Sequence, residues 1–339
     1  MSAASQLDQD KLIATLREVY GLEVSAMELV PKGSAAFIFV LRCAGGERYF
    51  LKLHDTRRHD ATASTDPRFY LQVAEALFTQ DRFRNLPRPI RTRAGYLQGA
   101  YSHYTTTLFT YIAGRTLEWE HPCPAEHLLT LARMVGRIHA ATPELGVEHT
   151  HVERFDPPFR PLLPGCLRDL ALVGDGARPS QAELRDLLLP RIGEMQALLT
   201  RLSELEREIE LREHEMVLCH TDLHGANLML GDDGELYILD WENAMIAPRE
   251  HDLFTFWNDD LRGVAHPRFE GFLTAYQETA GPVVPDLDLM QYYRIRRNLE
   301  DMTAFMMTIL YEDDGAESDR ADLGWIRIGL EEWPDPIVS

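Results

Sequence analysis

The chain has 339 residues, of which 54 are Asp or Glu and 34 are Lys or Arg, giving a formal net charge of −20 at pH 7. This charge disfavours nucleic acid and anionic membranes as partners and favours a small cationic or polar hydroxylated partner, although acidity also simply promotes solubility. No apolar run approaches the roughly 20 residues of a membrane-spanning helix, and no feature specifies an oligomeric state.

The N-terminus and the cysteines favour a cytoplasmic protein. The stretch MSAASQLDQDKLIATL lacks the basic region and the apolar run of a signal peptide. Cys43, Cys123, Cys166 and Cys219 lie far apart and form no CxxC pair. We interpret them as buried free thiols in a reducing compartment.

The first 110 residues have the pattern of a mixed α and β region. LDQDKLIATLREVYG carries apolar residues at helical spacing and ends at Gly21, a residue typical of a helix C-terminus. FIFVLRC and RYFLKLH are β-rich runs separated by a glycine pair, which predicts an antiparallel hairpin. A helix from about 68 to 80 and two further strand-like runs follow, of which GAYSHYTTTLFTYI is the clearer.

Beyond Gly114 the pattern becomes mostly helical. PAEHLLTLARMVGRIHAAT has apolar residues at helical spacing, and a longer apolar stripe runs from Ile192 to Ile209. That stripe covers fewer than three heptads, which favours a helix on a globular lobe over a coiled coil. We expect an α+β, bilobal fold, with a small β-rich lobe over residues 1–112, a hinge at about 109–114 and a large helical lobe over residues 113–339.

The segment HTDLHGANLMLGDDGELYILDWE, residues 220–242, gathers acids, an Asn and two histidines. His220 and His224 would suit zinc only on a helix, and Gly225 and the flanking strand-like runs argue against a helix here. The HExxH motif of metalloproteases is absent. A zinc site is therefore disfavoured.

A hairpin explains only part of this segment. Its turn, GDDG, accounts for residues 231–234 but not for Asp222, Asn227 and Asp240. Because a hairpin brings its two ends together, we expect Asn227 and Asp240 to be neighbours. Oxygen-bearing side chains that converge beside buried strands need a partner.

Phosphoryl transfer would supply that partner. The reaction needs a base to orient the attacking hydroxyl and Mg²⁺, which prefers oxygen ligands, to neutralise the phosphates. An Asp, an Asn five residues later and a hairpin that ends in a second Asp form the layout of a kinase catalytic loop. On this pattern Asp222 is the base, and Asn227 and Asp240 are magnesium ligands.

The same residues resemble the aminoglycoside phosphotransferase family, whose kinase-like enzymes carry His-x-Asp-Leu/Ile-His-x-x-Asn and then Ile-Asp-Trp/Phe-Glu/Asp. DWENAMIAPREHDLFTF and YYRIRRNLEDMTAF look most like the spectinomycin phosphotransferase branch. The resemblance runs from Leu12 to about Thr308 and is weak between residues 145 and 212. It implies a protein-kinase-like fold and, as cofactors, ATP or GTP with Mg²⁺.

The resemblance also implies roles around the nucleotide. Lys52, in RYFLKLH, would pair with the phosphates, with Glu75 on the next helix as its partner, although Glu75 could equally be a solvated helix residue. In the catalytic segment His220 would brace the loop, or be a hydrogen-bonded core histidine.

Two further nucleotide contacts are expected from the backbone. There is no GxGxxG motif, so the short turn with Gly33 and Ser34 would cover the phosphates, unless it is a plain hairpin turn. Thr110 and Ile112, in the connector LFTYIAGRTL, would offer backbone groups to the purine.

The acceptor side is defined by charge. An aminocyclitol carries ammonium groups, for which carboxylates are the matching partners, and the candidates are Glu242, Asp259, Asp260, Glu300 and Asp301. Glu242 could instead support the metal. Asp252 fits a helix N-terminus or a brace for the loop.

We therefore predict an ATP- (or GTP-) and Mg²⁺-dependent O-phosphotransferase that acts on a hydroxyl of an aminocyclitol or aminoglycoside antibiotic, with spectinomycin leading, and gives resistance. The alternative is a kinase of another small hydroxylated metabolite or antibiotic, such as choline, homoserine or methylthioribose. A protein kinase is disfavoured because DFG and APE motifs are missing after Asp240. A nucleotide-binding pseudokinase is disfavoured by the intact set of Lys52, Asp222, Asn227 and Asp240.

Overall fold

The computed structural model describes residues 7–30, 36–57, 67–117, 125–174, 176–257, 267–312 and 315–331. The chain divides into two compact units, one of residues 1–151 and 220–245 and the other of residues 152–219 and 246–339. The segment 220–242 therefore lies in the same unit as the N-terminal strands. The lobe boundary expected at 109–114 stays a prediction.

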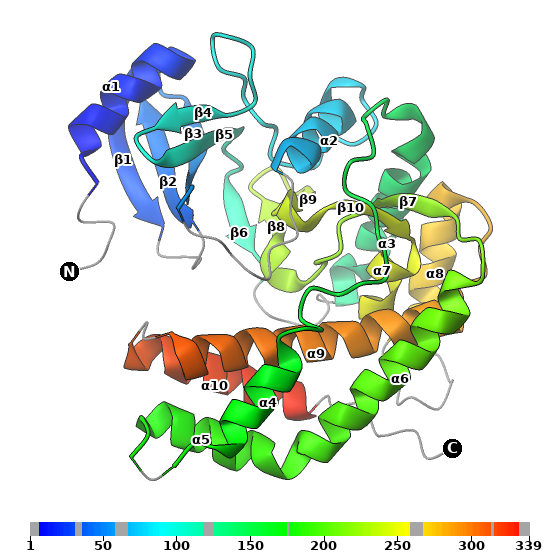
Figure 1. The fold of residues 1–339 in the computed structure, drawn as a ribbon. Coiled ribbons are helices and arrows are strands. Elements are labelled where there is room, and N and C mark those ends of the chain that lie inside the picture. Colours follow the sequence, from blue (N-terminus) through cyan, green and yellow to red (C-terminus); the bar gives the residue numbers. More distant parts are fainter. Residues whose placement is uncertain are drawn as a thin grey trace. The chain divides into compact units, whose positions relative to one another are not determined.

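The first unit is built on a five-stranded antiparallel sheet with the order β1-β2-β3-β5-β4 (Figure 1). Its strands are β1 (Val24–Val30), β2 (Ala36–Cys43), β3 (Arg48–Asp55), β4 (Gly99–Tyr101) and β5 (Tyr104–Thr110). The predicted hairpin is confirmed as β2 and β3, and Gly46 in its turn adopts a φ of 94°, a conformation that suits glycine.

Two helices in this unit follow the predicted pattern. The helix α1 (Gln9–Tyr20) begins where the Asp8 side chain accepts a hydrogen bond from the Lys11 N–H, and ends at Gly21 in the left-handed conformation. Its buried face, with Leu12 and Leu16, joins the apolar cluster of the sheet. The helix α2 (Pro67–Thr79) occupies the span predicted for it within one residue at each end.

A second, three-stranded antiparallel sheet in the first unit carries the catalytic segment. Its order is β6-β8-β9, with β6 (Gly114–Thr116), β8 (Leu228–Gly231) and β9 (Leu236–Ile238). The hairpin predicted from the GDDG turn is confirmed as β8 and β9. The helix α3 (Ala125–Ala141) and the short 3-10 helices η2 (Thr142–Glu144), η4 (Gly225–Asn227) and η5 (Trp241–Asn243) complete the described elements of this unit.

The second unit is mainly helical. Its elements are α4 (Leu163–Ala171), α5 (Pro179–Leu188), η3 (Leu189–Arg191), α6 (Ile192–Glu210), β7 (Met216–Cys219), β10 (Met245–Pro248), α7 (Glu250–Leu253), η6 (Phe254–Phe256), α8 (Pro267–Ala280), α9 (Leu287–Tyr311) and α10 (Ala316–Glu331). The two short strands β7 and β10 pair with each other.

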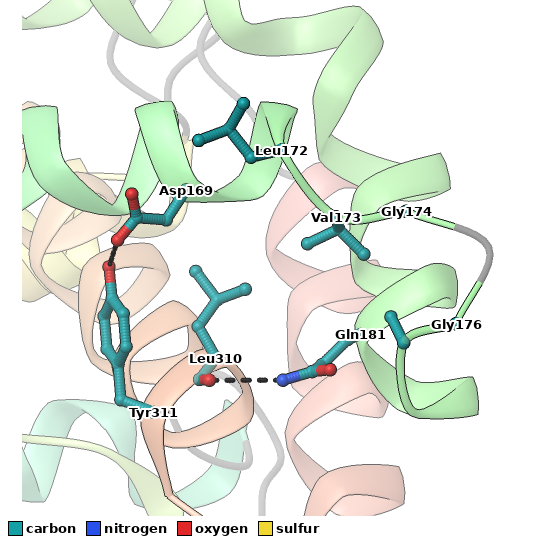
Figure 2. Close-up of a pocket in the computed structure, with 9 residues that line it drawn as sticks. Asp169, Leu172, Val173, Gly174, Gly176, Gln181, Leu310 and Tyr311 are labelled. Atoms are coloured by element: carbon teal, nitrogen blue, oxygen red, sulfur yellow. Dashed lines mark hydrogen bonds between the residues drawn. The ribbon is translucent and has the colours of Figure 1, made fainter.

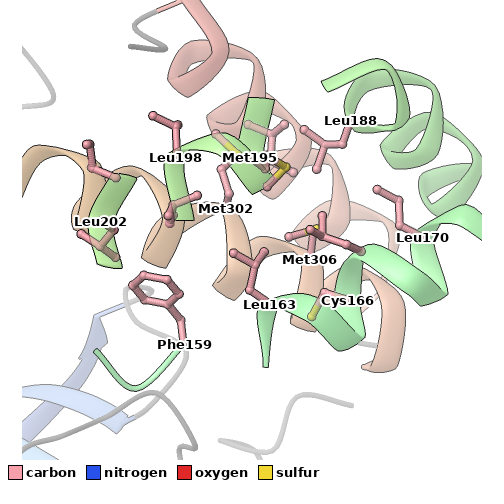
Figure 3. Close-up of a cluster of buried hydrophobic side chains, with 14 of the residues drawn as sticks. Phe159, Leu163, Cys166, Leu170, Leu188, Met195, Leu198, Leu202, Met302 and Met306 are labelled. Atoms are coloured by element: carbon pink, nitrogen blue, oxygen red, sulfur yellow. The ribbon is translucent and has the colours of Figure 1, made fainter. Parts of the chain in front are cut away.

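The core of the second unit forms where α6 packs against α9 (Figure 3). The apolar stripe predicted on residues 192–209 is buried there, since Met195, Leu202 and Ile209 have no exposed surface. Met302 and Met306 of α9 lie in the same cluster. The stripe is thus the core-facing side of a helix on a globular unit, as predicted, and not a coiled-coil arm.

The predicted α+β class is confirmed, because an antiparallel sheet dominates the N-terminal part and helices dominate the C-terminal part. None of the helices in the described ranges is both long and apolar enough to cross a bilayer.

Candidate active site

The β8–β9 hairpin brings Asn227 close to Asp240, as its pattern predicted. The Leu239 N–H, one residue before Asp240, donates to the Asn227 carbonyl over 2.8 Å. The Asn227 side-chain N–H₂ group donates to the Asp222 carbonyl at 2.9 Å and to Asp222 Oδ2 at 3.0 Å. Asn227 is therefore bonded to Asp222 directly and to the residue that precedes Asp240.

His220 bonds the backbone on both sides of the catalytic segment, at Leu239 and at Asp222. Its ring is fully buried, its Nε2–H donates to the Leu239 carbonyl over 2.7 Å, and its Nδ1 accepts from the Asp222 N–H over 3.3 Å. Because a carbonyl only accepts, the hydrogen bond to Leu239 assigns the ring proton to Nε2. The ring also meets Trp241 edge to face at 5.0 Å. His220 thus connects the residue that precedes Asp240 to the backbone of Asp222.

Backbone strain is concentrated in the same segment. Among the described residues, five that are not glycine have a positive φ, and two of them are Thr221 at 70° and Asp240 at 57°. The left-handed conformation is disfavoured for side chains with a Cβ, so surrounding contacts must hold it in place. Thr221 is held by its hydroxyl, which donates to the Asn243 carbonyl at 3.0 Å.

Lys52 is buried on β3 and is not the solvent-facing residue that alternation allowed. Its Nζ donates to Asp240 Oδ1 and to Glu242 Oε1, each over 2.7 Å. Burial lowers the pKa of Lys52, but the two carboxylates outweigh it and the pKa is raised. Burial likewise opposes ionisation of Glu242, yet Lys52 and His54 lower the Glu242 pKa to about 2. The group is therefore an ion cluster that stays charged at neutral pH.

Glu75 is not the partner of Lys52 in this structure, contrary to the prediction. Its carboxylate forms a bidentate pair with Arg91, in which Arg91 Nε donates to Oε1 over 2.6 Å. Glu75 lies five residues after Tyr70 on α2, and this spacing places the two side chains on different faces of the helix. Tyr70 is the buried one, at 3% exposure.

The sequence analysis singled out neither His54 nor Tyr70, which lie at the ion cluster. His54 Nε2 lies 3.5 Å from Glu242 Oε1, and period-two alternation along β3 puts His54 on the same face as Lys52, so this signal was present. Tyr70 is also close enough to the cluster for its pKa to be raised, mainly by burial and then by Glu242 and Asp240. No sequence motif marks that tyrosine.

The nucleotide contacts expected from the backbone stay predictions. The Thr110 N–H already donates to the Arg88 carbonyl, and the Thr110 hydroxyl accepts from the Arg88 N–H, each over 2.9 Å. Ile112 is partly buried in the connector between β5 and β6. Gly33 and Ser34 lie outside the described residues.

The remaining predicted site residues, one structural support and four candidates for substrate contact, belong to the second unit. Asp252 is buried in the first turn of α7. Glu300 Oε2 lies 3.7 Å from Arg296 Nε, and burial raises the pKa of Glu300 in spite of this guanidinium. Asp301 Oδ2 accepts from Arg297 Nε over 2.8 Å. The predicted residues Asp259 and Asp260 lie outside the described part of the chain.

The second unit also contains a cavity of about 450 Å³, which none of the predicted site residues lines. Leu172, Val173 and Leu310 give it aliphatic walls (Figure 2). At one side the Tyr311 hydroxyl donates to Asp169 Oδ2 over 2.7 Å. Asp169 and Tyr311, two polar residues of the cavity wall, thus bond each other. The candidate catalytic residues all lie in the first unit.

The donor atoms in the catalytic segment suit a hard divalent cation. Asn227 uses its N–H₂ group on Asp222, so its amide oxygen is the atom it can offer to a metal. The Asp240 side chain is 48% exposed and carries two carboxylate oxygens, of which Oδ1 accepts from Lys52. Oxygen donors of this kind match the preference of Mg²⁺.

Comparisons with known proteins agree with this geometry. A profile described as the phosphotransferase enzyme family matches residues 26–293 of the chain. An uncharacterized protein of Deinococcus radiodurans is 26% identical over 219 residues. That match spans 63% of this chain and only 58% of the Deinococcus protein.

Three solved structures similar to this chain are described as kinases or phosphotransferases. Spectinomycin phosphotransferase APH(9)-Ia, in complex with ADP and spectinomycin, has a TM-score of 0.75 at 19% identity and covers 94% of this chain and 93% of its own. Amicoumacin kinase hAmiN, with AMP-PNP and Ca²⁺, has a TM-score of 0.61 at 14% identity, with 98% and 96% covered. Choline kinase LicA from Streptococcus pneumoniae has a TM-score of 0.57 at 14% identity, with 96% and 98% covered. These likenesses confirm the kinase-like fold.

Proposed function

The chain belongs to the phosphotransferase enzyme family, and we propose that it transfers the γ-phosphoryl group of ATP (or GTP) to a hydroxyl of a small cationic or polar substrate. Membership supports the predicted kind of enzyme, a small-molecule kinase. The hydrogen bonds made by the catalytic segment carry the proposal: Asn227 bonds Asp222 and also Leu239, which precedes Asp240, and Lys52 bonds Asp240.

Each residue has a task that its position supports. Asp222 orients the acceptor hydroxyl and takes its proton, because Asn227 holds one carboxylate oxygen and His220 holds the backbone of the same residue. Lys52 brings a charged ammonium to the nucleotide phosphates. Asn227 and Asp240 would hold Mg²⁺, which neutralises the charge on the phosphates when bound.

For the acceptor we propose an aminocyclitol or aminoglycoside antibiotic, with spectinomycin leading and resistance as the consequence. Support comes from the net charge of −20, which favours cationic substrates, and from the similarity to spectinomycin phosphotransferase. The alternative acceptor is a small amino alcohol or another metabolite, since a choline kinase and an aminopropanol kinase share the fold. We also propose a cytoplasmic location, consistent with ATP as donor and with free thiols at Cys43, Cys166 and Cys219.

A mass-spectrometric screen tests the acceptor directly. The purified chain is incubated with ATP, Mg²⁺ and single members of a panel of spectinomycin, aminoglycosides, choline and small amino alcohols. We expect one class to gain a phosphoryl group. Stabilisation of the chain by ATP without any phosphorylated product in the panel would favour the pseudokinase alternative.

A further inference from the structure

The ammonium of Lys52 is held by two carboxylates that come from one short turn. Asp240 and Glu242 both belong to the stretch where β9 passes into η5, and each accepts from Lys52 Nζ over 2.7 Å. The Lys52 side chain is only 11% exposed. A buried ammonium needs an opposite charge that stays in place, because an unpaired one is strongly destabilising.

The two carboxylates are not equivalent. The Asp240 side chain is 48% exposed, whereas that of Glu242 is 26% exposed and lies between two basic side chains of β3. His54, two residues along the same face of that strand, approaches Glu242 Oε1 to 3.5 Å. Glu242 is therefore directed at β3, while Asp240 keeps open surface for a ligand.

The helix α2 brings no carboxylate to Lys52 among its described residues. Its glutamate, Glu75, is engaged by Arg91 through a bidentate pair. The residue that α2 turns toward the ion cluster is Tyr70, whose ring is buried and whose pKa responds to Glu242 and Asp240. This helix also packs directly on η5, the turn that contains Glu242.

We propose that Glu242 is the positioning residue of Lys52 and takes the part that sequence reasoning gave to Glu75. This inference rests on the proposed function. Glu242 fixes the ammonium on β3 while Asp240 serves the metal, and His54 lies 3.5 Å from the same carboxylate oxygen, Oε1. On this account Glu242 is neither a metal ligand nor a contact of the substrate ammonium groups.

Equilibrium binding of ATP to the full chain tests the proposal, with and without Mg²⁺ (EDTA in the second case). The test variants are Glu242→Gln, Glu242→Asp, Lys52→Met and the double variant that combines Lys52→Met with Glu242→Gln. The matched control is Glu75→Gln. We expect Glu242→Gln to weaken ATP binding about tenfold both with Mg²⁺ and in EDTA, because the ammonium loses its position in each case. Glu75→Gln should stay within about twofold of the unchanged chain.

Two further results separate positioning from a general loss of structure. In the Lys52→Met background, Glu242→Gln should cause no additional loss, since it acts through the lysine. Glu242→Asp, which keeps the charge, should recover part of the affinity, and circular dichroism should show the unchanged fold in each variant.

The contrary outcomes are distinct. If Glu242→Gln weakened ATP binding only in the presence of Mg²⁺ and not in EDTA, Glu242 would be a metal ligand and the inference would be overturned. Unchanged affinity in Glu242→Gln, or a loss in Glu75→Gln instead, would overturn it as well. If the unchanged chain binds no ATP at all, the proposed function fails, and this inference fails with it.

Discussion

The pair of Glu153 and Arg296 gives a sharp test of how the second unit is stabilised. Their side chains are 3% and 11% exposed, and Arg296 Nη1 donates to Glu153 Oε2. The other carboxylate oxygen accepts from the N–H groups of Arg154 and Phe155 at 2.9 and 2.8 Å. The pair thus joins the 153–155 segment to the middle of α9. Burial lowers the pKa of Arg296, but the Glu153 carboxylate outweighs this effect, and the pKa is raised.

Replacement of Glu153 by Gln keeps the shape and an acceptor for the two N–H groups but leaves the Arg296 charge without its main partner. Removal of one member of a buried ion pair costs about 3–5 kcal/mol, and we expect about 3 kcal/mol here because the amide retains part of the hydrogen bonding. Urea unfolding followed by circular dichroism measures the loss.

The matched control is Glu300→Gln, because Glu300 lies 3.7 Å from Arg296 Nε and its side chain is 29% exposed. It should cost less than about 1 kcal/mol. The double variant Glu153→Gln, Arg296→Met should be more stable than Glu153→Gln alone, since it removes the unpaired charge. Equal losses in the two Gln variants, or a double variant less stable than Glu153→Gln, would refute this account of the pair.

Three further predictions concern single sites. Burial raises the Glu250 pKa although the Asp286 N–H donates to its carboxylate over 3.0 Å, so ionisation of Glu250 opposes folding. The free energy of unfolding of Glu250→Gln, relative to that of the unchanged chain, should therefore rise as the pH increases from 4 to 7. A difference in urea unfolding that does not depend on pH would contradict this. Asp8→Ala should cost about 1 kcal/mol because the Lys11 N–H loses its cap, and a melting temperature equal to that of the unchanged chain would argue against the cap. Gly234→Ala, at a φ of 82° in the β8–β9 turn, should cost about 1–2 kcal/mol, which chemical denaturation measures; no loss would mean that the turn relaxes.

The sequence predicted the features that local chemistry determines. Alternation and glycine turns located the β2–β3 and β8–β9 hairpins, and Gly21 marked the C-terminal end of α1. The hairpin pattern also implied that Asn227 and Asp240 lie near each other, and Asn227 does bond Leu239, the residue before Asp240.

Features that depend on packing between distant segments could not be predicted. Helical periodicity located α2 but not which of its faces turns to the ion cluster. Glu75 was therefore expected as the partner of Lys52, whereas the α2 residue nearest the cluster's carboxylates is Tyr70. The sequence left the role of Glu242 open between metal support and substrate contact, because its contact with Lys52 joins residues 190 positions apart. The strand β6 was missed, since three residues carry too little pattern and its partner β8 lies more than 100 residues away.

Turnover of the Asp222→Asn variant tests the central claim most directly. The control is Asp233→Asn, the same acid-to-amide change in the β8–β9 turn, where Asp233 bonds Tyr237 and Glu235. With ATP, Mg²⁺ and the acceptor found by the screen, we predict that Asp233→Asn retains the turnover of the unchanged chain. Asp222→Asn should lose at least about 100-fold in kcat because no base receives the hydroxyl proton. Turnover by Asp222→Asn close to that of the unchanged chain would contradict the assigned mechanism.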